Sequence, residues 1–209
     1  MLLGFDTATP RVTVALWSEG EVVGRSDSDQ AMRHGELLGP GIAAALRDAG
    51  ATRRDISAIA VGVGPGPFTG LRVGLVTARV LGWTLDVPVS GVCTLDVIAA
   101  ADELRGIDEF AVASDARRKE VYFARYRGGV RVAGPVVERP EIVATTLPVA
   151  GQGAVLYPAA FPHAVDVGFP DAGVLCRVVS EGRVETLAPE PLYLRRPDAV
   201  APGQPKRVS

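Results

Sequence analysis

The chain has 209 residues, of which 47% are hydrophobic and 22% are charged, so it is long and apolar enough to bury a core. Its formal net charge of −2 argues against a nucleic-acid-binding protein that works alone. No apolar run reaches the roughly 18 residues that span a bilayer, and the first residues lack the basic flank and cleavage site of a secretion signal. We therefore expect a cytoplasmic protein without a membrane segment.

The first predicted elements are three strands followed by a helix. The strands span residues 2–5, 12–16 and 21–25. Because only short turns separate them, the pattern predicts an antiparallel meander. The helix covers about 33–49, and Pro40 inside it predicts a kink or a late start.

The next segment, residues 62–74, reads Gly-Val-Gly-Pro-Gly-Pro-Phe-Thr-Gly-Leu-Arg-Val-Gly and is the most distinctive part of the chain. The short apolar run 59–61 before it suits a buried strand, which the glycines and prolines then end. Thr69 is a good N-cap for a second long helix, at about 69–86.

Both long helices carry a small residue at every fourth position. These residues are Gly35, Gly39 and Ala43 in the first helix and Gly70, Gly74, Ala78 and Gly82 in the second. Glycines inside a helix cost stability relative to alanine, so close packing is the expected compensation. The pattern predicts that the two helices form a matched pair whose bare ridges contact another helix, of this chain or of a partner.

After a strand at 87–92 and a helix at 95–104, the first pattern repeats. Moving the sequence by 109 positions places Asp6 on Asp115 and Gly20 on Gly129, with no gap between them. Further on, the offset falls to 89, so the second half lacks about twenty residues that correspond to most of the first long helix.

We therefore predict an α/β fold of the actin-like (ASKHA) class, built from two ribonuclease H-like domains of which the second is truncated. The predicted boundaries are 1–105 for the first domain, 106–196 for the smaller second domain and 197–209 for a flexible tail.

Few residues offer chemistry. The glycine-rich loop lacks both the dinucleotide fingerprint and the Gly-Lys-Ser/Thr of a P-loop, and its two prolines remove N–H donors. Asp6 and Thr7 lie where actin-like ATPases place their first phosphate loop, so one interpretation is a vestigial phosphate loop. Asp6 equally suits a carboxylate that binds amides of its own turn.

The titratable residues that often form catalytic or metal sites are also scarce. The only histidines, His34 and His163, lie far apart, and Cys93 and Cys176 belong to no nucleophile motif. We therefore predict no catalytic residue, no metal site and two reduced structural thiols. Short basic clusters occur at 53–54, 117–119 and 195–196, and each taken singly reads as a solvated turn or strand end.

The chain resembles the TsaB (formerly YeaZ) family over nearly its whole length. The matching segments are Asp6-Thr7-Ala8-Thr9; His34 with Glu36 and Leu38; Gly62 to Gly74; Gly91 to Leu95; Asp115-Ala116-Arg117 with Glu120-Val121-Tyr122; and Glu190 to Arg195. Pro67 stands where the family usually has serine.

The resemblance implies a non-catalytic scaffold that dimerises with its catalytic paralogue TsaD, works with the ATPase TsaE, and supports threonylcarbamoyl transfer to the tRNA adenosine beside the anticodon. No cofactor is expected on this chain alone; ATP and a metal are expected on TsaD, and tRNA is expected only as a partner of the complex. The two positions of the TsaD histidine pair fall on Thr94 and Ile98. A homodimer through the same surface is also possible. The implied interface residues are His34, Gly35, Leu38, Gly39, Ile42, Ala43, Phe68, Gly70, Arg72, Val73, Gly74, Ala78 and Gly82.

Two alternatives belong to other functional classes. Asp6, Thr7 and the glycine-rich loop suit an actin-like ATPase or a small-molecule kinase. A metallopeptidase is the third hypothesis, and the chain lacks the histidine pair that it needs.

Overall fold

The computed structural model describes residues 1–30 and 33–195. Residue 196 and the predicted tail at 197–209 lie outside the described residues. The first half contains β1 (Leu2–Asp6), β2 (Val12–Ser18), β3 (Glu21–Ser28), α1 (His34–Asp48), η1 (Arg53–Asp55), β4 (Ala58–Gly62), α2 (Phe68–Leu85), β5 (Val89–Val92), α3 (Thr94–Ala99) and η2 (Asp102–Leu104). The second half contains β6 (Glu109–Asp115), β7 (Val121–Arg127), β8 (Val130–Glu138), β9 (Val149–Ala150), α4 (Gln152–Leu156) and α5 (Ala172–Ser180).

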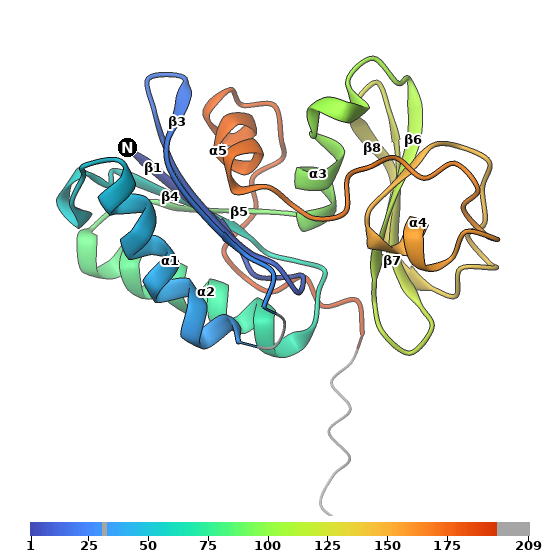
Figure 1. Cartoon of the computed structure of the whole chain (residues 1–209), viewed down its shortest axis with the longest axis horizontal. Coiled ribbons are helices and arrows are strands. Elements are labelled where there is room, and N and C mark those ends of the chain that lie inside the picture. The colour runs from blue at the N-terminus through green and yellow to red at the C-terminus, as the bar shows by residue number, and fades with distance from the viewer. Residues whose placement is uncertain (31–32, 196–209) are drawn as a thin grey trace, which may run out of the picture.

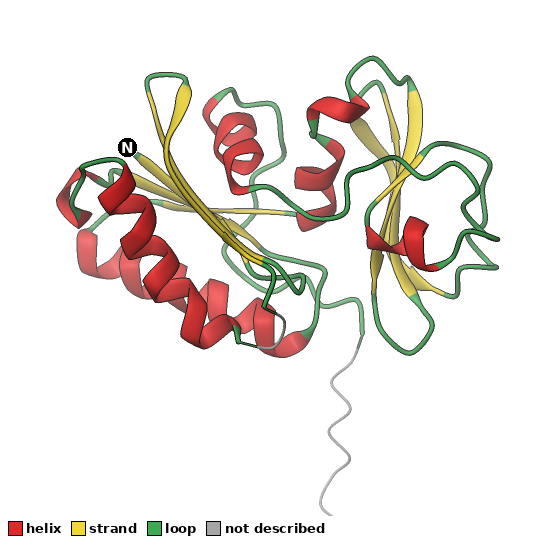
Figure 2. Cartoon of the chain, in the orientation of Figure 1, coloured by secondary structure: helices red, strands yellow, loops and turns green. Residues whose placement is uncertain are grey.

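The first sheet has the strand order β3-β2-β1-β4-β5. β1, β2 and β3 pair antiparallel, which confirms the predicted meander, and β4 and β5 continue from β1 in parallel. Helices α1 and α2 lie side by side on one face of this sheet, as Figures 1 and 2 show. Pro40 lies within one uninterrupted helix.

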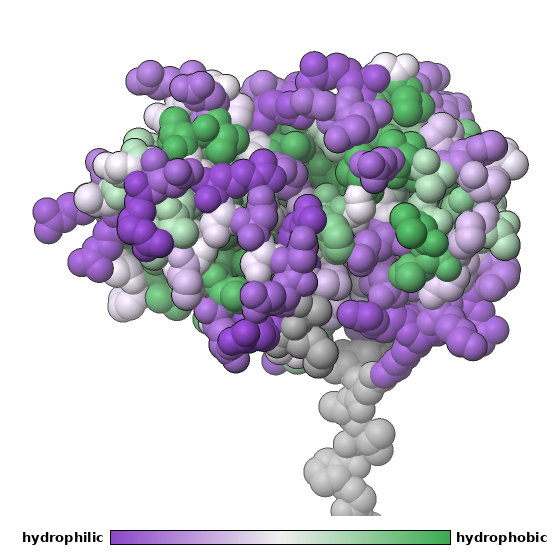
Figure 3. Space-filling view, in the orientation of Figure 1, coloured by the Kyte–Doolittle hydropathy of each residue, from purple (hydrophilic) through white to green (hydrophobic). Residues whose placement is uncertain are grey.

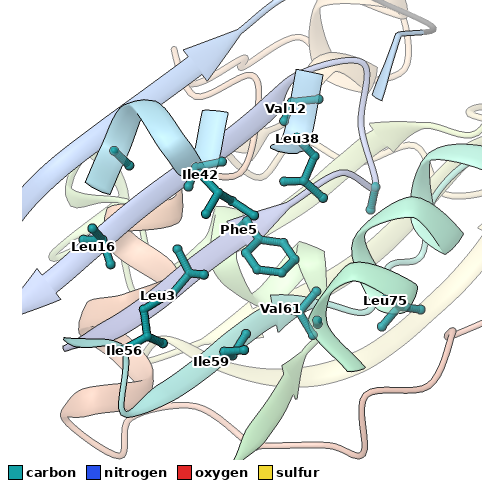
Figure 4. Close-up of a cluster of buried hydrophobic side chains, with 14 of the residues drawn as sticks. Leu3, Phe5, Val12, Leu16, Leu38, Ile42, Ile56, Ile59, Val61 and Leu75 are labelled. Carbon is teal, nitrogen blue, oxygen red and sulfur yellow. The ribbon is translucent and has the colours of Figure 1, made fainter. Parts of the chain in front are cut away.

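Apolar side chains of the first sheet pack beneath these two helices. Figure 4 shows Leu3 and Phe5 of β1 in this core together with Leu38 and Ile42 of α1 and Leu75 of α2. All five side chains are at most 9% exposed. Burial of this apolar area is the main stabilising contribution that holds the helix pair on the sheet.

The second sheet has the order β8-β7-β6-β9, the same arrangement as β3-β2-β1-β4. The shift of 109 positions carries Val12–Ser18 onto the observed bounds of β7, Val121–Arg127. No helix corresponding to α1 occurs between β8 and β9, so the predicted duplication and truncation are confirmed in the described chain.

Helix α5 departs from the predicted division of the chain. It follows the second sheet in sequence but packs against β1 and β2, on the face of the first sheet opposite α1 and α2 (Figure 1). A Cβ on Gly4 would lie 2.4 Å from Cys176 Sγ, so the glycine leaves room for this helix. The described part of the predicted second domain, residues 106–195, therefore does not form one separate body.

The segment 187–195, which we call the strap, returns along the first sheet. Leu187 and Gly91 exchange backbone hydrogen bonds of 2.8 Å, and the Leu192 N–H donates to the Val63 carbonyl at 2.8 Å. The side chain of Leu192 packs against the cores of both sheets. The strap therefore joins the two sheets at the end where the central loop lies.

Candidate functional site

The Asp6 carboxylate is the hub of the central loop. Its Oδ1 accepts a hydrogen bond from the Ala8 N–H at 2.7 Å, and its Oδ2 accepts one from the Thr94 hydroxyl at 2.7 Å. The Gly64 N–H donates to the same Thr94 hydroxyl at 3.2 Å. A Cβ on Gly62 would overlap the Asp6 carboxylate, so the glycine permits this close approach. Three distant segments therefore meet around one carboxylate.

Burial of Asp6 changes its proton affinity. The side chain is 0% exposed, and this desolvation raises its pKa from an ordinary 3.8 to about 6, although the bonds from Ala8 and Thr94 oppose the change. The carboxylate already accepts hydrogen bonds from its own turn and from Thr94. This agrees with the interpretation from the sequence in which Asp6 binds amides of its own turn. In this conformation it is closed to a phosphate or a metal ion from solvent.

Thr7 is occupied in the same way. Its hydroxyl donates to the Gly70 carbonyl at 2.8 Å and accepts from the Gly74 N–H at 3.1 Å. The threonine is 1% exposed. It therefore fastens the end of β1 to the first turns of α2 and does not present a hydroxyl to a ligand.

Thr94 and Ile98, where the family resemblance places the histidine pair of TsaD, do not suit a metal. Thr94 is 0% exposed and bound to Asp6, and Ile98 is 1% exposed in the core between α3 and the second sheet. Within residues 1–30 and 33–195, no group of three or more His, Cys, Asp or Glu side chains could hold a metal ion. Both cysteines are free, and burial raises the pKa of each thiol to about 12.

The small-residue ridge of α2 is the main correction to the sequence interpretation. Gly70, Gly74, Ala78 and Gly82 are all buried. Added Cβ atoms would lie 2.5 Å from the Thr7 carbonyl oxygen at Gly70, 2.4 Å from Thr7 Oγ1 at Gly74, and 2.3 Å from a Val89 methyl at Gly82. The ridge lets α2 approach the chain's own strands, so these four residues are not available to a partner.

The ridge of α1, in contrast, is open. Gly35, Gly39 and Ala43 are exposed, and a Cβ added to either glycine would meet nothing within 4 Å. Leu38 and Ile42 were predicted to lie in the interface, but they face the core and are therefore not available to a partner.

The remaining interface candidates lie at the start of the helices. Phe68 and Arg72 are exposed and Val73 is half-buried. His34 is half-buried, and its Nε2 lies 2.7 Å from the Thr9 carbonyl oxygen, so it ties the start of α1 to the β1–β2 turn. Thr69, predicted as the N-cap, is instead the second residue of α2, which begins after Pro67.

Sequence reasoning missed an exposed apolar face on α2. Val76 is 60% exposed, Val80 54% and Trp83 87%, at spacings that place them on one side of the helix. In the sequence, α2 is apolar on nearly every side. Its exposed side could therefore be distinguished from its buried side only once the small residues were known to face inward. We call Gly35, Gly39, Ala43, Val76, Val80 and Trp83 the helix-pair face.

A buried polar cluster lies between the two sheets. The Tyr126 hydroxyl donates to Asp96 Oδ1 at 2.7 Å, and Arg131 Nε lies 3.4 Å from the same oxygen. Burial raises the pKa of Asp96, whereas the tyrosine hydrogen bond and the Arg131 charge lower it. The cluster joins α3 to β7 and β8 and has no nucleophile, because the pKa of the nearby Cys93 thiol is raised.

Comparisons with known proteins agree with this architecture. A family model described as "TsaD: tRNA N6-adenosine threonylcarbamoyltransferase" matches residues 26–156. An uncharacterized protein of Mycobacterium tuberculosis is 42% identical over 202 residues, which are 95% of this chain and 93% of that protein. The Escherichia coli "tRNA threonylcarbamoyladenosine biosynthesis protein TsaB" is 37% identical over 127 residues, which are 60% of this chain and 54% of that protein. The solved structure "YeaZ from Pseudomonas aeruginosa" has a TM-score of 0.77 and 31% identity, and the match covers 92% of this chain and 99% of that chain.

The duplicated sheets with a shortened second half define an actin-like protein, here with its first loop closed by its own hydrogen bonds. The agreement in sequence and in structure over almost the whole chain makes the assignment more specific. The chain belongs to the TsaB (YeaZ) family.

Proposed function

We propose that this chain is a non-catalytic scaffold subunit that pairs with a TsaD paralogue and supports threonylcarbamoyl transfer to the tRNA adenosine beside the anticodon. The observation that carries the proposal is the exposed helix-pair face on a molecule whose candidate reactive groups are buried. The family's biosynthetic role in threonylcarbamoyladenosine formation, named for its Escherichia coli and Bacillus subtilis members, supplies the pathway.

The helix-pair face has the character of a protein interface. Trp83 is 87% exposed beside two exposed valines, and tryptophan is enriched among the residues that contribute most of the binding energy at interfaces. On the neighbouring helix α1, Gly35 and Gly39 leave the backbone uncovered. A partner's helices can therefore pack against the exposed side chains of α2 and approach the uncovered backbone of α1.

The charges on α2 favour a different partner over a second copy. Its only charged residues are Arg72 and Arg79, and both are exposed. A two-fold contact between copies of this helix brings like charges together, whereas a partner with acidic side chains compensates them. A homodimer through the helix-pair face is therefore the weaker pairing, formed when TsaD is absent.

In this proposal the partner carries out the chemistry. Asp6 and Thr7 are buried and hydrogen-bonded, and the family resemblance places the TsaD histidine pair at Thr94 and Ile98, which are also buried. In the proposed assembly ATP and metal belong to TsaD, TsaE is the ATPase, and tRNA is the substrate of the complex. The site of action is the cytoplasm. In the described chain, no helix has the length and apolar character needed to cross a bilayer.

The test is to mix the chain with the TsaD paralogue of the same organism and to measure the mass of the complex by light scattering. Trp83→Ala is expected to weaken pairing about 30-fold or more, because a central anchor is lost. Gly39→Leu is expected to block pairing by filling the bare surface of α1 while the chain stays folded. Val155→Ala, at a position that is 71% exposed on α4, is the matched control and is expected to pair normally.

Two results would contradict the proposal. If both helix-pair variants pair with TsaD as the parent chain does, the helix-pair face is not the interface. Micromolar binding of ATP with magnesium to the isolated chain, measured by calorimetry, would favour the ATPase or kinase alternative over a scaffold.

A further inference from the structure

Three segments that are distant in sequence meet at the end of the molecule that holds the central loop. The rings of Phe68 at the start of α2 and Tyr193 in the strap stack with centroids 5.3 Å apart. Arg72 Nε donates to the Tyr193 hydroxyl at 3.0 Å. Two residues along the strap, an Arg195 guanidinium N–H donates to the Ala116 carbonyl in the β6–β7 turn at 2.9 Å. Figure 1 shows this turn beside the end of the strap.

These contacts join basic residues that the sequence presents as separate clusters. The basic surface consists of Arg72, Arg117, Arg118, Lys119 and Arg195. Its carboxylates within the same segments are Asp115, which pairs with Arg117, Glu120, which pairs with Arg195, and Glu190 in the strap. Five cations therefore lie among three carboxylates, in a chain whose overall charge is −2. Figure 3 shows hydrophilic residues gathered at this end of the second sheet.

The β6–β7 turn displays its basic residues at a conformational cost. Arg117, Arg118 and Lys119 have φ of 59°, 56° and 61°, which is the left-handed region that L-residues other than glycine avoid. All three are exposed. The turn is held by its own hydrogen bonds, among them the one from the Arg117 N–H to Asp115 Oδ1 at 2.8 Å. Backbone strain that neighbouring bonds maintain is typical of functional positions.

The aromatic part of the surface offers a second kind of contact. Phe68 is 40% exposed and Tyr193 is 38% exposed, although the two rings stack on each other. The Arg72 guanidinium lies over the Phe68 ring at 3.6 Å. Proteins recognise unpaired nucleotides by combining cations for the phosphates with aromatic and guanidinium planes for the bases. An acidic protein segment would satisfy the cations alone.

We propose that this basic surface binds RNA, with the β6–β7 turn contacting phosphates and the Phe68–Tyr193 pair stacking on an unpaired base. The identity of the RNA as tRNA rests on the proposed function. The surface adjoins the helix-pair face at the start of α2, so RNA bound here lies along the edge of the partner contact. The chain then contributes to substrate binding although it holds no reactive group.

The experiment measures the affinity of fluorescently labelled tRNA transcript by anisotropy over a series of salt concentrations, for the isolated chain and for its mixture with TsaD. Arg117→Glu combined with Lys119→Glu is expected to weaken binding at least tenfold and to reduce the slope of log affinity against log salt by about 2. The matched control combines Arg53→Glu with Arg54→Glu, an equal charge change on η1, before the start of β4. We expect this control to change affinity less than about twofold.

Tyr193→Leu tests the stacking contribution separately. Leucine keeps an apolar side chain against Phe68 but offers no ring face, so a loss of about tenfold that persists at high salt is expected. Thermal unfolding of each variant shows that it is folded before binding is compared.

The outcomes separate this proposal from the scaffold function, because pairing with TsaD is measured without RNA. RNA affinity that falls only in the turn and Tyr193 variants supports the surface, whether or not pairing occurs. Equal losses in the turn variant and the η1 control, or unchanged affinity in the turn variant, would each overturn it. Absence of RNA binding by both the isolated chain and the mixture would overturn it as well.

Discussion

Thr7 and Gly74 are in direct contact although 67 positions separate them. The Gly74 N–H donates to Thr7 Oγ1 at 3.1 Å, and a Cβ on Gly74 would lie 2.4 Å from that same oxygen. The glycine is therefore required by the threonine, and the small-residue ridge of α2 serves the monomer's own packing. This relationship locates the end of β1 against the first turns of α2.

We predict that Gly74→Ala destabilises the protein by about 2 kcal/mol, because either Thr7 or the helix must move away from the new methyl group. Gly39→Ala is the matched control, since a Cβ there meets nothing within 4 Å and alanine favours a helix by about 0.5 to 1 kcal/mol. Urea denaturation of both variants measures the two effects. Equal stabilisation by both changes would show that the contact with Thr7 is not tight.

The second prediction concerns pH. The folded-state pKa of Asp6 is about 6, above its ordinary value of 3.8, so the native state holds this proton more tightly than the unfolded chain. The contribution of Asp6 to stability is therefore fully present below pH 3.8 and is lost as the pH rises through 6. Each pKa unit corresponds to about 1.4 kcal/mol, which makes the loss about 3 kcal/mol.

Asp6→Asn removes this titration while keeping a side-chain oxygen for the Ala8 N–H. Relative to the parent chain, the variant is expected to gain about 2 kcal/mol of unfolding free energy between pH 4 and pH 7. Denaturation at several pH values measures the difference, and titrations common to both proteins cancel. A constant difference across this range would mean that Asp6 keeps an ordinary pKa.

Much of the fold could be predicted from the sequence. Strand patterns and the repeat between Asp6 and Asp115 identify both sheets, because local propensity and periodicity determine them. The docking of α5 could not be predicted, because it depends on the space that Gly4 leaves beside Cys176. A glycine in a strand indicates close approach of another segment but does not say which segment approaches.

The candidate site was predicted only in part. Gly35 and Gly39 are exposed and so remain available to a partner helix, but Gly74 and Gly82 face strands, because the same small-residue spacing serves a sheet as well as a second helix. Trp83 had no signal of its own in the sequence, since an apolar residue in an apolar helix is ordinarily buried. Exposure is a property of the packed chain.

The third prediction tests the buried cluster between the sheets. Tyr126→Phe removes the 2.7 Å hydrogen bond to Asp96, which is expected to cost about 1 to 3 kcal/mol at pH 7. Because that bond lowers the raised pKa of Asp96, its loss raises the pKa further, so the variant loses more stability at pH 7 than at pH 4. Denaturation at the two pH values is the measurement, and an effect independent of pH would contradict an ionised Asp96 at neutral pH.

The last prediction concerns the strap. Leu192 packs against the cores of both sheets, and its N–H donates to the Val63 carbonyl. Leu192→Ala keeps the backbone bond but removes half-buried apolar area, so we expect a loss of about 1 to 2 kcal/mol. Leu156→Ala on α4, at a 53% exposed position, is the control for a leucine outside the strap. Because the strap lies between the two units, hydrogen exchange should accelerate near the central loop and in the β6–β7 turn together. Faster exchange at the strap alone would show that the sheets hold together without it.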